Sequence, residues 1–260
     1  MAAEVKRDLF DLSGRVAIVT GGYRGIGEAI ALGLADCGAD VALVDIVPEP
    51  EGRAAAERLK QKTGVESIYI RTDVSQPEAV RRMAEAALSH FGNIDILCNN
   101  AGIARGGPLV SMAEKPIQDL LQVNLIGVVN ACREVGKIFV QQRRGNVVNM
   151  ASTDGEAGTV NGSIYSATKG GVIALTRALA IEWASCNVRV NAISPQVVQT
   201  DMTKGRLSKA GEYEKDVRRI PLGRLLRPKD LQGAAIFLAS DASAMVTGHI
   251  LHVDGGYLAA

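Results

Sequence analysis

The sequence is poor in the side chains from which most metal centres are built. Its 260 residues include three histidines and four cysteines, and no spacing among them matches a metal-ligand motif. They are scattered along the chain at Cys37, Cys98, Cys132, Cys186, His90, His249 and His252. We therefore expect no metal site, no catalytic histidine and four buried, reduced thiols.

Long apolar runs and a strong net charge are also absent. The sequence has no run of about 18 apolar residues, the minimum for a membrane-spanning helix, and residues 1–8 lack the apolar centre of a signal peptide. A formal net charge of +1 provides neither a nucleic-acid footprint nor strong attraction to a membrane surface. We expect a cytoplasmic protein, or one of another reducing compartment, whose partners are small molecules.

Apolar runs and helical stretches alternate along the chain. Hydrophobic residues make up 47% of the sequence, enough for one domain with a large core. Long helices are expected near residues 113–142 and 163–185. Short runs rich in β-branched residues predict strands at 16–19, 41–45, 67–72, 94–98, 145–150, 188–193 and 250–253.

This alternation predicts an α/β fold. Strands that are joined by helices run parallel, with right-handed crossovers. Strands without polar alternation are covered on both faces. We therefore predict a single doubly wound parallel sheet with helices on both faces. Residues 1–10 are expected to form a loose arm, and residues 11–260 a single domain.

A glycine-rich segment, Thr20-Gly-Gly-Tyr-Arg-Gly-Ile-Gly27, lies between the first predicted strand and a helical run. Gly21 permits a tight bend, and Gly25 and Gly27 permit close approach of a ligand to the backbone. The following helix N-terminus offers free N–H groups to a pyrophosphate. The spacing is G-x-x-x-G-x-G instead of the common G-x-G-x-x-G. The glycines alone therefore also fit an ordinary strand-to-helix turn.

An acidic residue at the end of the second predicted strand favours a dinucleotide site. Asp45 follows Gly27 by 18 residues. At about this position a carboxylate bonds the ribose hydroxyls of adenosine. The turn and the carboxylate together predict dinucleotide binding.

Tyr165 and Lys169 are four residues apart in a predicted helix, so their side chains share one face. A free phenol has a pKa near ~10 and is a poor proton shuttle at neutral pH, but a nearby ammonium lowers that pKa. Such a tyrosine can take a proton from an alcohol or give one to a carbonyl. Ser152, thirteen residues earlier, can hydrogen-bond the substrate oxygen. Taken singly, the pair also fits a surface contact, and the serine a helix cap.

In the order of its motifs, the chain resembles the short-chain dehydrogenase/reductase family. The resemblance extends from residue 12 to residue 257. It implies a Rossmann sheet of about seven strands in the order 3-2-1-4-5-6-7, and hydride transfer with a nicotinamide cofactor. The matching segments are residues 20–27, Asp73-Val74, Asn99-Asn100-Ala101-Gly102, Asn124, Ser152, Tyr165 with Lys169, Ser194-Pro195, Val246-Thr-Gly and Val253-Asp-Gly-Gly.

The resemblance implies a catalytic role for four residues. Tyr165 would move the proton of the reacting hydroxyl, and Lys169 would lower the tyrosine pKa and bond the nicotinamide ribose. Ser152 would orient the substrate oxygen. Asn124 lies inside a predicted helix, where asparagine is disfavoured. It would bend that helix and hold a water that links Lys169 to solvent; a locally bonded core amide is the alternative.

The resemblance also implies a set of cofactor contacts. Asp73 and Val74 would lie at the adenine, although an aspartate after a strand also fits a helix cap. Residues 100–102 would line the nicotinamide-side ribose and support the sheet, and Val198 and Thr200 would contact the carboxamide. The full set is Gly21, Tyr23, Arg24, Gly25, Ile26, Gly27, Asp45, Asp73, Val74, Asn100, Ala101, Gly102, Tyr165, Lys169, Pro195, Val198 and Thr200.

Two residues point to different cofactors. Asp45 would repel a 2′-phosphate, which favours NAD. Arg24 occupies a position where NADP-using relatives often place a basic residue; alternatively it pairs with Asp45 or faces solvent. Because repulsion at contact distance acts directly against NADP, we predict NAD as the cofactor, with NADP less favoured.

The predicted substrate site is polar. Gln196 replaces the glycine that usually follows Pro195 in the family, and it either bonds the substrate or is a solvated turn residue. Asp154, close after Ser152, can bond hydroxyl groups. A lid is expected at about 196–220, where charged side chains are frequent and an apolar lining is absent. The expected substrate contacts are Ser152, Asp154, Tyr165 and Gln196.

These features favour a small polyol or sugar as substrate. Reduction of a 3-oxoacyl thioester is an alternative, although enzymes of that branch usually prefer NADP. A non-catalytic NAD-binding regulator is a further alternative, disfavoured by the complete catalytic set. The two long predicted helices resemble those that form the family's subunit contacts, so a homotetramer, or a homodimer, is expected.

Overall fold

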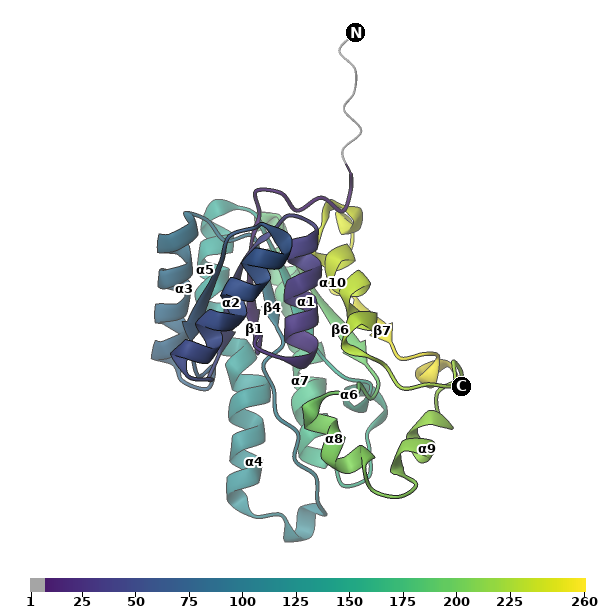
Figure 1. Ribbon diagram of the computed structural model, residues 1–260. Helices are drawn as coiled ribbons and strands as arrows, with labels where there is room; N and C mark the ends of the chain where they lie inside the picture. Colours follow the sequence, from purple (N-terminus) through teal and green to yellow (C-terminus); the bar gives the residue numbers. More distant parts are fainter. Residues whose placement is uncertain (1–7) are drawn as a thin grey trace.

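The computed structural model describes residues 8–260 and contains a seven-stranded parallel sheet in the order β3-β2-β1-β4-β5-β6-β7 (Figure 1). The predicted fold class and strand order are confirmed. The predicted loose arm, residues 1–10, lies largely outside the described residues. The strands are β1 (Val16–Thr20), β2 (Asp40–Asp45), β3 (Ser67–Arg71), β4 (Ile96–Asn99), β5 (Gly145–Met150), β6 (Val188–Pro195) and β7 (Ile250–Val253).

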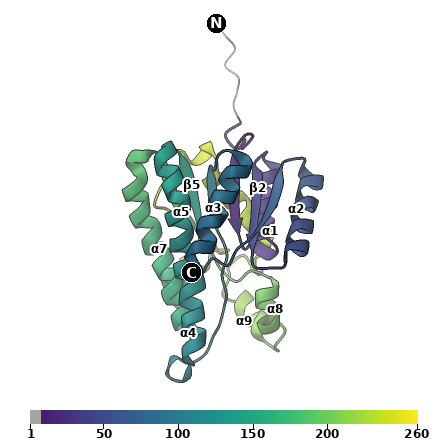
Figure 2. The same cartoon turned by 90° about the vertical axis from the view of Figure 1, so that its left-hand side faces the viewer.

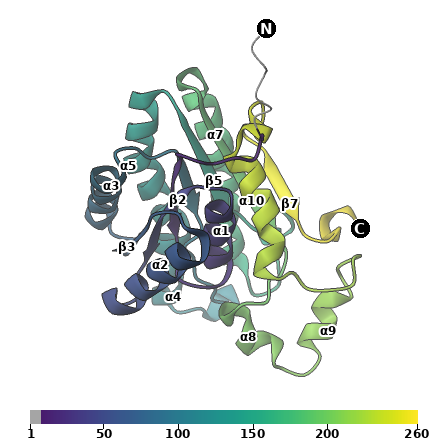
Figure 3. The same ribbon diagram turned by 45° about the horizontal axis from the view of Figure 1, so that its top comes forward.

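Helices cover both faces of the sheet (Figures 2 and 3). One face carries α1 (Gly25–Asp36), α2 (Glu49–Thr63) and α10 (Gln232–Ala239). The other carries α3 (Pro77–Phe91), α5 (Gly127–Gln142) and α7 (Ser163–Trp183). Shorter helices gather beyond the carboxyl ends of the strands, in the lower part of Figure 1: α4 (Glu114–Leu121), α6 (Asp154–Ala157), α8 (Asp201–Leu207) and α9 (Glu212–Val217).

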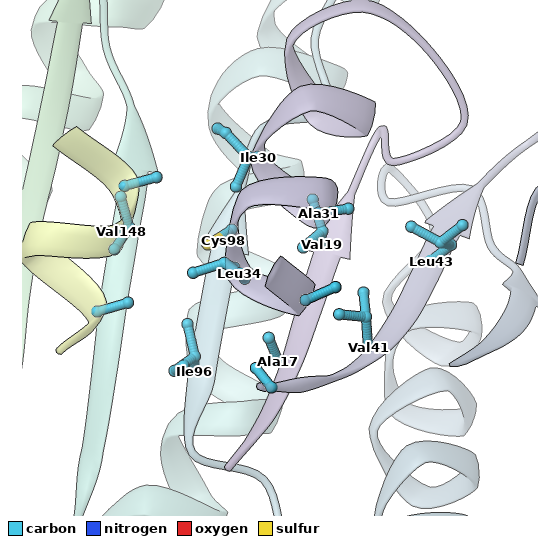
Figure 4. Close-up of a cluster of buried hydrophobic side chains, with 14 of the residues drawn as sticks. Ala17, Val19, Ile30, Ala31, Leu34, Val41, Leu43, Ile96, Cys98 and Val148 are labelled. Atoms are coloured by element: carbon cyan, nitrogen blue, oxygen red, sulfur yellow. The ribbon is translucent and has the colours of Figure 1, made fainter. Parts of the chain in front are cut away.

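The core is built from apolar side chains that the strands present to both helix layers. All five residues of β1 are buried. Val19 packs with Leu34 of α1 and Val41 of β2 in one layer (Figure 4), and Ile18 belongs to the opposite layer. Burial of apolar surface contributes roughly 25 cal/mol per Å². A strand that is buried on both faces is therefore strongly held in its place in the sheet.

The long helix predicted at 113–142 is interrupted. A π-helical segment, Gln122–Ile126, separates α4 from α5 and contains Asn124. In such a segment the backbone hydrogen bonds shift from i−4 to i−5, a local change that is frequent at functional sites. The helix predicted at 163–185 ends at Trp183 and continues as a 3-10 turn, Ala184–Cys186.

Three strands extend beyond their predicted apolar runs. β1 ends at Thr20, β4 at Asn99 and β6 at Pro195. The polar residues end the apolar pattern, but their backbones continue the ladder, in which Thr20 is paired with Asn99. Pro195 is tolerated because it occupies the last position of its strand. The strand ends therefore deliver polar groups to one edge of the sheet.

The cysteines differ from the prediction of four buried thiols. All four are free. Cys98 and Cys132 are buried, which raises the pKa of each thiol to about 12. Cys37 and Cys186 are only partly buried, because they lie at the ends of helical segments. Within residues 8–260, no cluster of three or more His, Cys, Asp or Glu side chains could hold a metal ion, and no helix is long and apolar enough to cross a bilayer.

Candidate active site

The glycine turn has the geometry of an anion cradle. Gly21 and Gly25 have φ values of 64° and 63°, in the left-handed region that favours glycine. A Cβ on Gly27 would lie 2.0 Å from the carbonyl oxygen of Gly21, so a side chain is excluded there. Helix α1 begins at Gly25, and Arg24 supplies no side-chain cap. The first N–H groups of α1 are thus available to the phosphates of a dinucleotide, and this segment fits such a cofactor.

Asn100 and Thr20 hold this turn in shape. The Asn100 amide donates hydrogen bonds to the carbonyl oxygens of Thr20 and Gly21, at 3.0 and 3.1 Å. The Thr20 hydroxyl oxygen accepts from the backbone N–H groups of Asn100 and Ala101, at 3.0 and 3.1 Å. The segment after β4 is therefore tied to the glycine turn, and the Asn100 amide shapes the backbone that would meet the cofactor.

Asp45 lies beside the glycine turn. Its carboxylate accepts hydrogen bonds from the backbone N–H groups of Tyr23 and Ile46, at 3.3 and 2.8 Å. Arg24 does not pair with Asp45, an alternative considered above; instead its guanidinium lies 3.7 Å from the carboxylate of Asp201 in α8. Both side chains of that pair are 69% exposed, so the contact is weak.

Asp73 and Val74 lie just before α3, and both have structural partners. The Asp73 carboxylate accepts hydrogen bonds from the Ser75 N–H and hydroxyl, at 2.9 and 2.7 Å. Val74 is buried, and its carbonyl oxygen accepts from the Asn130 amide at 3.0 Å. Asp73 therefore stabilises the turn before α3 and is not the helix cap considered as an alternative, since the N-cap residue of α3 is Gln76. A contact of either residue with adenine stays a prediction.

Tyr165 and Lys169 lie on α7, as predicted, but they do not form a direct hydrogen bond. The Lys169 ammonium donates to the carbonyl oxygen of Met150 at 2.7 Å and lies 5.8 Å from the centroid of the Tyr165 ring. Lys169 is buried, with 5% of its surface exposed. Loss of hydration disfavours the charged form, and burial lowers the pKa of Lys169 to about 8.

The acidity of Tyr165 differs from the sequence-based expectation. Burial raises the pKa of Tyr165 to about 12. A hydrogen bond with Ser152 opposes this rise, and the negative charge of Asp154 adds to it. The predicted lowering by Lys169 is not observed, because burial has the larger effect and the ammonium is directed at Met150 instead of the phenol.

Ser152 follows β5 and is itself buried. Its hydroxyl oxygen accepts a hydrogen bond from the N–H of Asp154 at 3.2 Å, at the start of α6. The neighbouring Thr153 is fully buried, and its hydroxyl has no partner among the described residues. Ser152 therefore touches both the phenol of Tyr165 and the loop that carries Asp154.

Asn124 is fully buried, and its whole side-chain amide is bonded to Ile103. Its Oδ1 accepts from the Ile103 N–H, and its Nδ2 donates to the Ile103 carbonyl, both at 2.8 Å. A Cβ on Gly102 would lie 3.3 Å from Asn124 Oδ1 and 3.9 Å from Lys169 Nζ. Asn124 and Lys169 thus flank one point, but the locally bonded amide considered as an alternative is what the structure contains.

The segment after β6 approaches the glycine turn. A Cβ on Gly25 would lie 3.5 Å from the Thr200 methyl group, and Thr200 begins α8 with a capping box. Val198 is buried in the core. The Gln196 side-chain oxygen accepts from the N–H of Val197 at 2.8 Å. Gln196 thereby stabilises its own turn, the local role considered above, which leaves its amide nitrogen able to donate elsewhere.

One polar cluster at this edge was not foreseen. The Glu156 carboxylate accepts a hydrogen bond from Ser194 at 3.0 Å, and its two oxygens lie 2.9 and 3.0 Å from His252 Nε2. These contacts tie α6 to β6 and β7. Glu156 and His252 are 96 residues apart, so only the parallel pairing of β6 with β7 brings them together, and no local motif indicates the contact.

Comparison with known proteins agrees with this geometry. Residues 21–258 match the family model described as Enoyl-(Acyl carrier protein) reductase. A 3-oxoacyl-(acyl-carrier-protein) reductase, FabG, of Chlamydia muridarum is 40% identical over 246 residues, which cover 94% of this chain and 98% of the relative. A 2-dehydro-3-deoxy-D-gluconate 5-dehydrogenase of Dickeya dadantii is 38% identical over 253 residues, 96% of this chain and 98% of the relative.

A solved structure extends the likeness to the whole fold. The gluconate 5-dehydrogenase of Burkholderia cenocepacia, in complex with NADP and tartrate, superposes with a TM-score of 0.94 and 35% identity. The match covers 97% of this chain and 98% of that one. The family model and these relatives span nearly the whole sequence. The chain therefore belongs to the short-chain dehydrogenase/reductase family of oxidoreductases, enzymes that act on CH–OH and keto groups.

Proposed function

We propose that this chain is an NAD-dependent oxidoreductase that interconverts a secondary alcohol and a ketone in a small polyol or sugar. The observation that carries the proposal is the juxtaposition of Tyr165, Ser152 and buried Lys169 at the sheet edge that also carries the glycine turn. A cofactor at that turn would supply the hydride acceptor or donor. The protein would supply the proton transfer and the orientation of the substrate.

Tyr165 is the proposed proton carrier. In alcohol oxidation its phenolate accepts the hydroxyl proton, and in ketone reduction its phenol donates one. Ser152, which already bonds the phenol, orients the reacting oxygen and stabilises charge that develops on it. Lys169 bonds the nicotinamide ribose and adds positive charge to the site.

Asn124 has a less direct part in the proposed relay. Its side-chain oxygen and nitrogen each make one hydrogen bond to Ile103, which leaves the amide one lone pair and one N–H for the water of the relay. The backbone of the π-helical segment shares that task, because a shifted hydrogen-bond ladder frees a carbonyl oxygen. Asn124 also positions this segment beside Lys169. In the proposed relay, Tyr165, Lys169 and Ser152 act through their side chains. Asn124 acts through its remaining amide groups and by positioning the backbone that also holds the water.

The preference for NAD rests on Asp45. Its carboxylate lies beside the N–H of Tyr23 at the glycine turn, where it would accept hydrogen bonds from ribose hydroxyls and repel a 2′-phosphate. Arg24 favours NADP, and the Burkholderia relative carries NADP. We favour NAD because Asp45 is anchored to the turn by backbone hydrogen bonds, whereas Arg24 is mostly exposed.

The polar surroundings of the site favour a hydroxylated substrate. Asp154 lies two residues after Ser152, and Gln196 follows Pro195, whose carbonyl oxygen accepts a hydrogen bond from the Thr153 N–H. Both side chains have groups that bond hydroxyls. The residues proposed as a lid, about 196–220, include the short helices α8 and α9. Two of the similar proteins are named for gluconate or a deoxygluconate, which also supports a polyhydroxylated compound.

A second function is favoured by one observation. The Chlamydia relative, at 40% identity, is named as a 3-oxoacyl-(acyl-carrier-protein) reductase, so reduction of a 3-oxoacyl thioester is the alternative reaction. A non-catalytic NAD-binding regulator is a third possibility, which the complete catalytic set disfavours.

A substrate panel separates these functions. Polyols and sugars are offered with NAD and with NADP, and acetoacetyl-CoA is offered with NADH and with NADPH, while absorbance of the reduced nicotinamide is followed. The proposal predicts turnover of a polyol or sugar with NAD. Fast reduction of acetoacetyl-CoA with NADPH alone would favour the alternative. Cofactor binding without turnover of any compound would favour a regulator.

We further propose a cytoplasmic homotetramer, or a homodimer, that associates through the outer faces of α5 and α7. Apolar side chains there are exposed: Val140 of α5 is 37% and Ile181 of α7 is 81% exposed. Exposed apolar surface of this kind is a common feature of subunit contacts. Light scattering after size-exclusion chromatography tests this proposal, and a monomer at micromolar concentration would contradict it.

A further inference from the structure

A cavity of about 480 Å³ lies beside α6, the helix that follows Ser152. Its wall includes Ala157 of α6 and, from the segment after α9, Arg218 and Arg219. Tyr257, in the last 3-10 turn, also lines the cavity. The cavity is therefore formed where the catalytic loop, the proposed lid and the C-terminal segment meet.

Arg219 is held in this wall by an aromatic ring. Its guanidinium carbon lies 4.8 Å from the centroid of the Tyr257 ring, and a guanidinium nitrogen donates to the Tyr257 hydroxyl. Arg206 and Arg224 pair with carboxylates of the protein, but Arg219 forms no ion pair within residues 8–260. A stacked guanidinium with unused N–H donors is suited to bind the two oxygens of an anionic group.

The positive charge of Arg219 influences Asp154, which lies next to the proposed catalytic residues. Burial raises the pKa of Asp154, and the positive charges of Arg219 and Arg206 oppose that rise. The negative charge of Asp154 in turn raises the pKa of Tyr165, and the Asp154 N–H donates a hydrogen bond to the Ser152 hydroxyl. Asp154 and Ala157 lie in the same helical turn, α6, so the wall of the cavity begins within one turn of Asp154.

We propose that Arg219 binds an anionic oxygen group, a carboxylate or a phosphate, at the end of a small polyhydroxylated substrate. This inference rests on the proposed function and narrows its substrate class from polyols in general to acidic ones. Tyr257 orients the guanidinium, and Asp154 faces the hydroxyls between the anionic end and the reacting carbon. Arg219 is thus a specificity-determining residue.

Three six-carbon compounds, which carry a carboxylate at C1, no charged group, or a phosphate at C6, test the inference. D-Gluconate, D-sorbitol and D-sorbitol 6-phosphate are compared as substrates with NAD. We expect kcat/KM for one of the two anionic compounds to exceed that for sorbitol at least about tenfold, because a charge-assisted pair is stronger than a neutral one. Whichever anion is preferred identifies the source, carboxylate or phosphate.

Variants then assign the preference to Arg219. Arg219→Gln should raise KM for the preferred anion roughly 10- to 100-fold, with sorbitol within about twofold of the wild type. Arg219→Lys should recover part of the loss, because it restores the charge without the planar fork. Lys229→Gln is the control, since it removes one exposed positive charge outside the cavity. Equal effects of Arg219→Gln on the anion and on sorbitol would overturn the inference.

A binding measurement separates failure of this inference from failure of the proposed function. Gluconate and sorbitol 6-phosphate are titrated by calorimetry into Tyr165→Phe enzyme that is saturated with NAD. If the wild-type enzyme turns over no compound, but adding Arg219→Gln to the Tyr165→Phe enzyme weakens anion binding at least tenfold, the proposed function fails and the anion site stands. If sorbitol is oxidised and neither anion binds through Arg219, the function stands and the anion site is wrong.

Discussion

The Lys169 ammonium is bonded to the carbonyl oxygen of Met150, at 2.7 Å, and not to the hydroxyl of Tyr165. Met150 ends β5, two residues before Ser152. The hydrogen bond therefore fixes the lysine against the strand that delivers the serine. The lysine is buried, and its charge has few partners. Its position therefore lowers the free energy of unfolding, while it places a positive charge in the proposed active site.

Lys169→Met should stabilise the protein while abolishing turnover. Burial lowers the pKa of Lys169 from 10.5 to about 8, which means that the folded state disfavours the ammonium. Removing that charge should raise the free energy of unfolding at neutral pH by about 1–3 kcal/mol, measured by urea denaturation. Lys62→Met, at an exposed position of α2, is the control and should change stability by less than about 0.5 kcal/mol.

The stability gain of Lys169→Met should depend on pH. Between pH 8 and 10.5 the unfolded wild-type chain binds more protons at this lysine than the folded chain, so wild-type stability from this group rises with pH. The advantage of the variant is therefore complete below pH 8 and is lost as pH approaches 10.5. An advantage that stayed constant across this range would show that packing, and not charge burial, causes it.

The two reaction directions should respond differently to pH. Because the pKa of Tyr165 is raised to about 12, the phenol is protonated at neutral pH and ready to act as an acid. Reduction should therefore vary little around neutrality, whereas oxidation should accelerate as pH rises and the phenolate fraction grows. Ser152→Ala removes a hydrogen bond that lowers this pKa, so it should shift the rise in oxidation to higher pH. Profiles of kcat/KM check both effects; a downward shift would refute the role of Ser152.

Asp45→Ala should change the cofactor preference. Without the carboxylate, the ribose hydroxyls lose an acceptor and a 2′-phosphate is no longer repelled. We expect kcat/KM with NAD to fall roughly 10- to 100-fold and that with NADP to rise, as each interaction of this kind is worth about 1.5–3 kcal/mol. Asp40→Ala, at the other end of β2, is the control and should leave the ratio unchanged. An unaltered ratio in Asp45→Ala would remove the argument for NAD.

Asn124→Ala should loosen the π-helical segment. It removes two hydrogen bonds and leaves the N–H and carbonyl of Ile103 without their partner. Unpaired buried groups cost about 1–3 kcal/mol each, so we expect a clear loss of stability together with a lower kcat. Asn130→Ala is the comparison, since it removes only one hydrogen bond, to Val74. It should cost less stability, and if it lowers kcat equally, the effect of Asn124 is general destabilisation.

Much of the fold follows from local patterns, and the contacts of the site follow from them only in part. The run Val16–Thr20 is apolar and rich in β-branched residues, a pattern that predicts a strand covered on both faces, and all five residues are buried. The positions of Tyr165 and Lys169 follow from helical spacing. The direction of the lysine does not, because it depends on a carbonyl supplied by β5.

Other features depended on long-range contacts. Asn124 was an evident irregularity in a helix, but its pairing with Ile103 comes from the loop after β4. Glu156 meets His252 only through the order of the last two strands. The raised pKa of Tyr165 reflects burial of its phenol by the surrounding fold, which the four-residue spacing of Tyr165 and Lys169 cannot predict.

Tyr165 carries the proton in the proposed reaction, and the Tyr165→Phe variant isolates this role. This change removes one hydroxyl and leaves the ring in place. We expect kcat to fall about 100- to 10,000-fold, the usual contribution of general acid–base catalysis, while the dissociation constant for NAD stays within about threefold of the wild-type value. Turnover near the wild-type rate, with NAD still bound, would contradict this role of Tyr165.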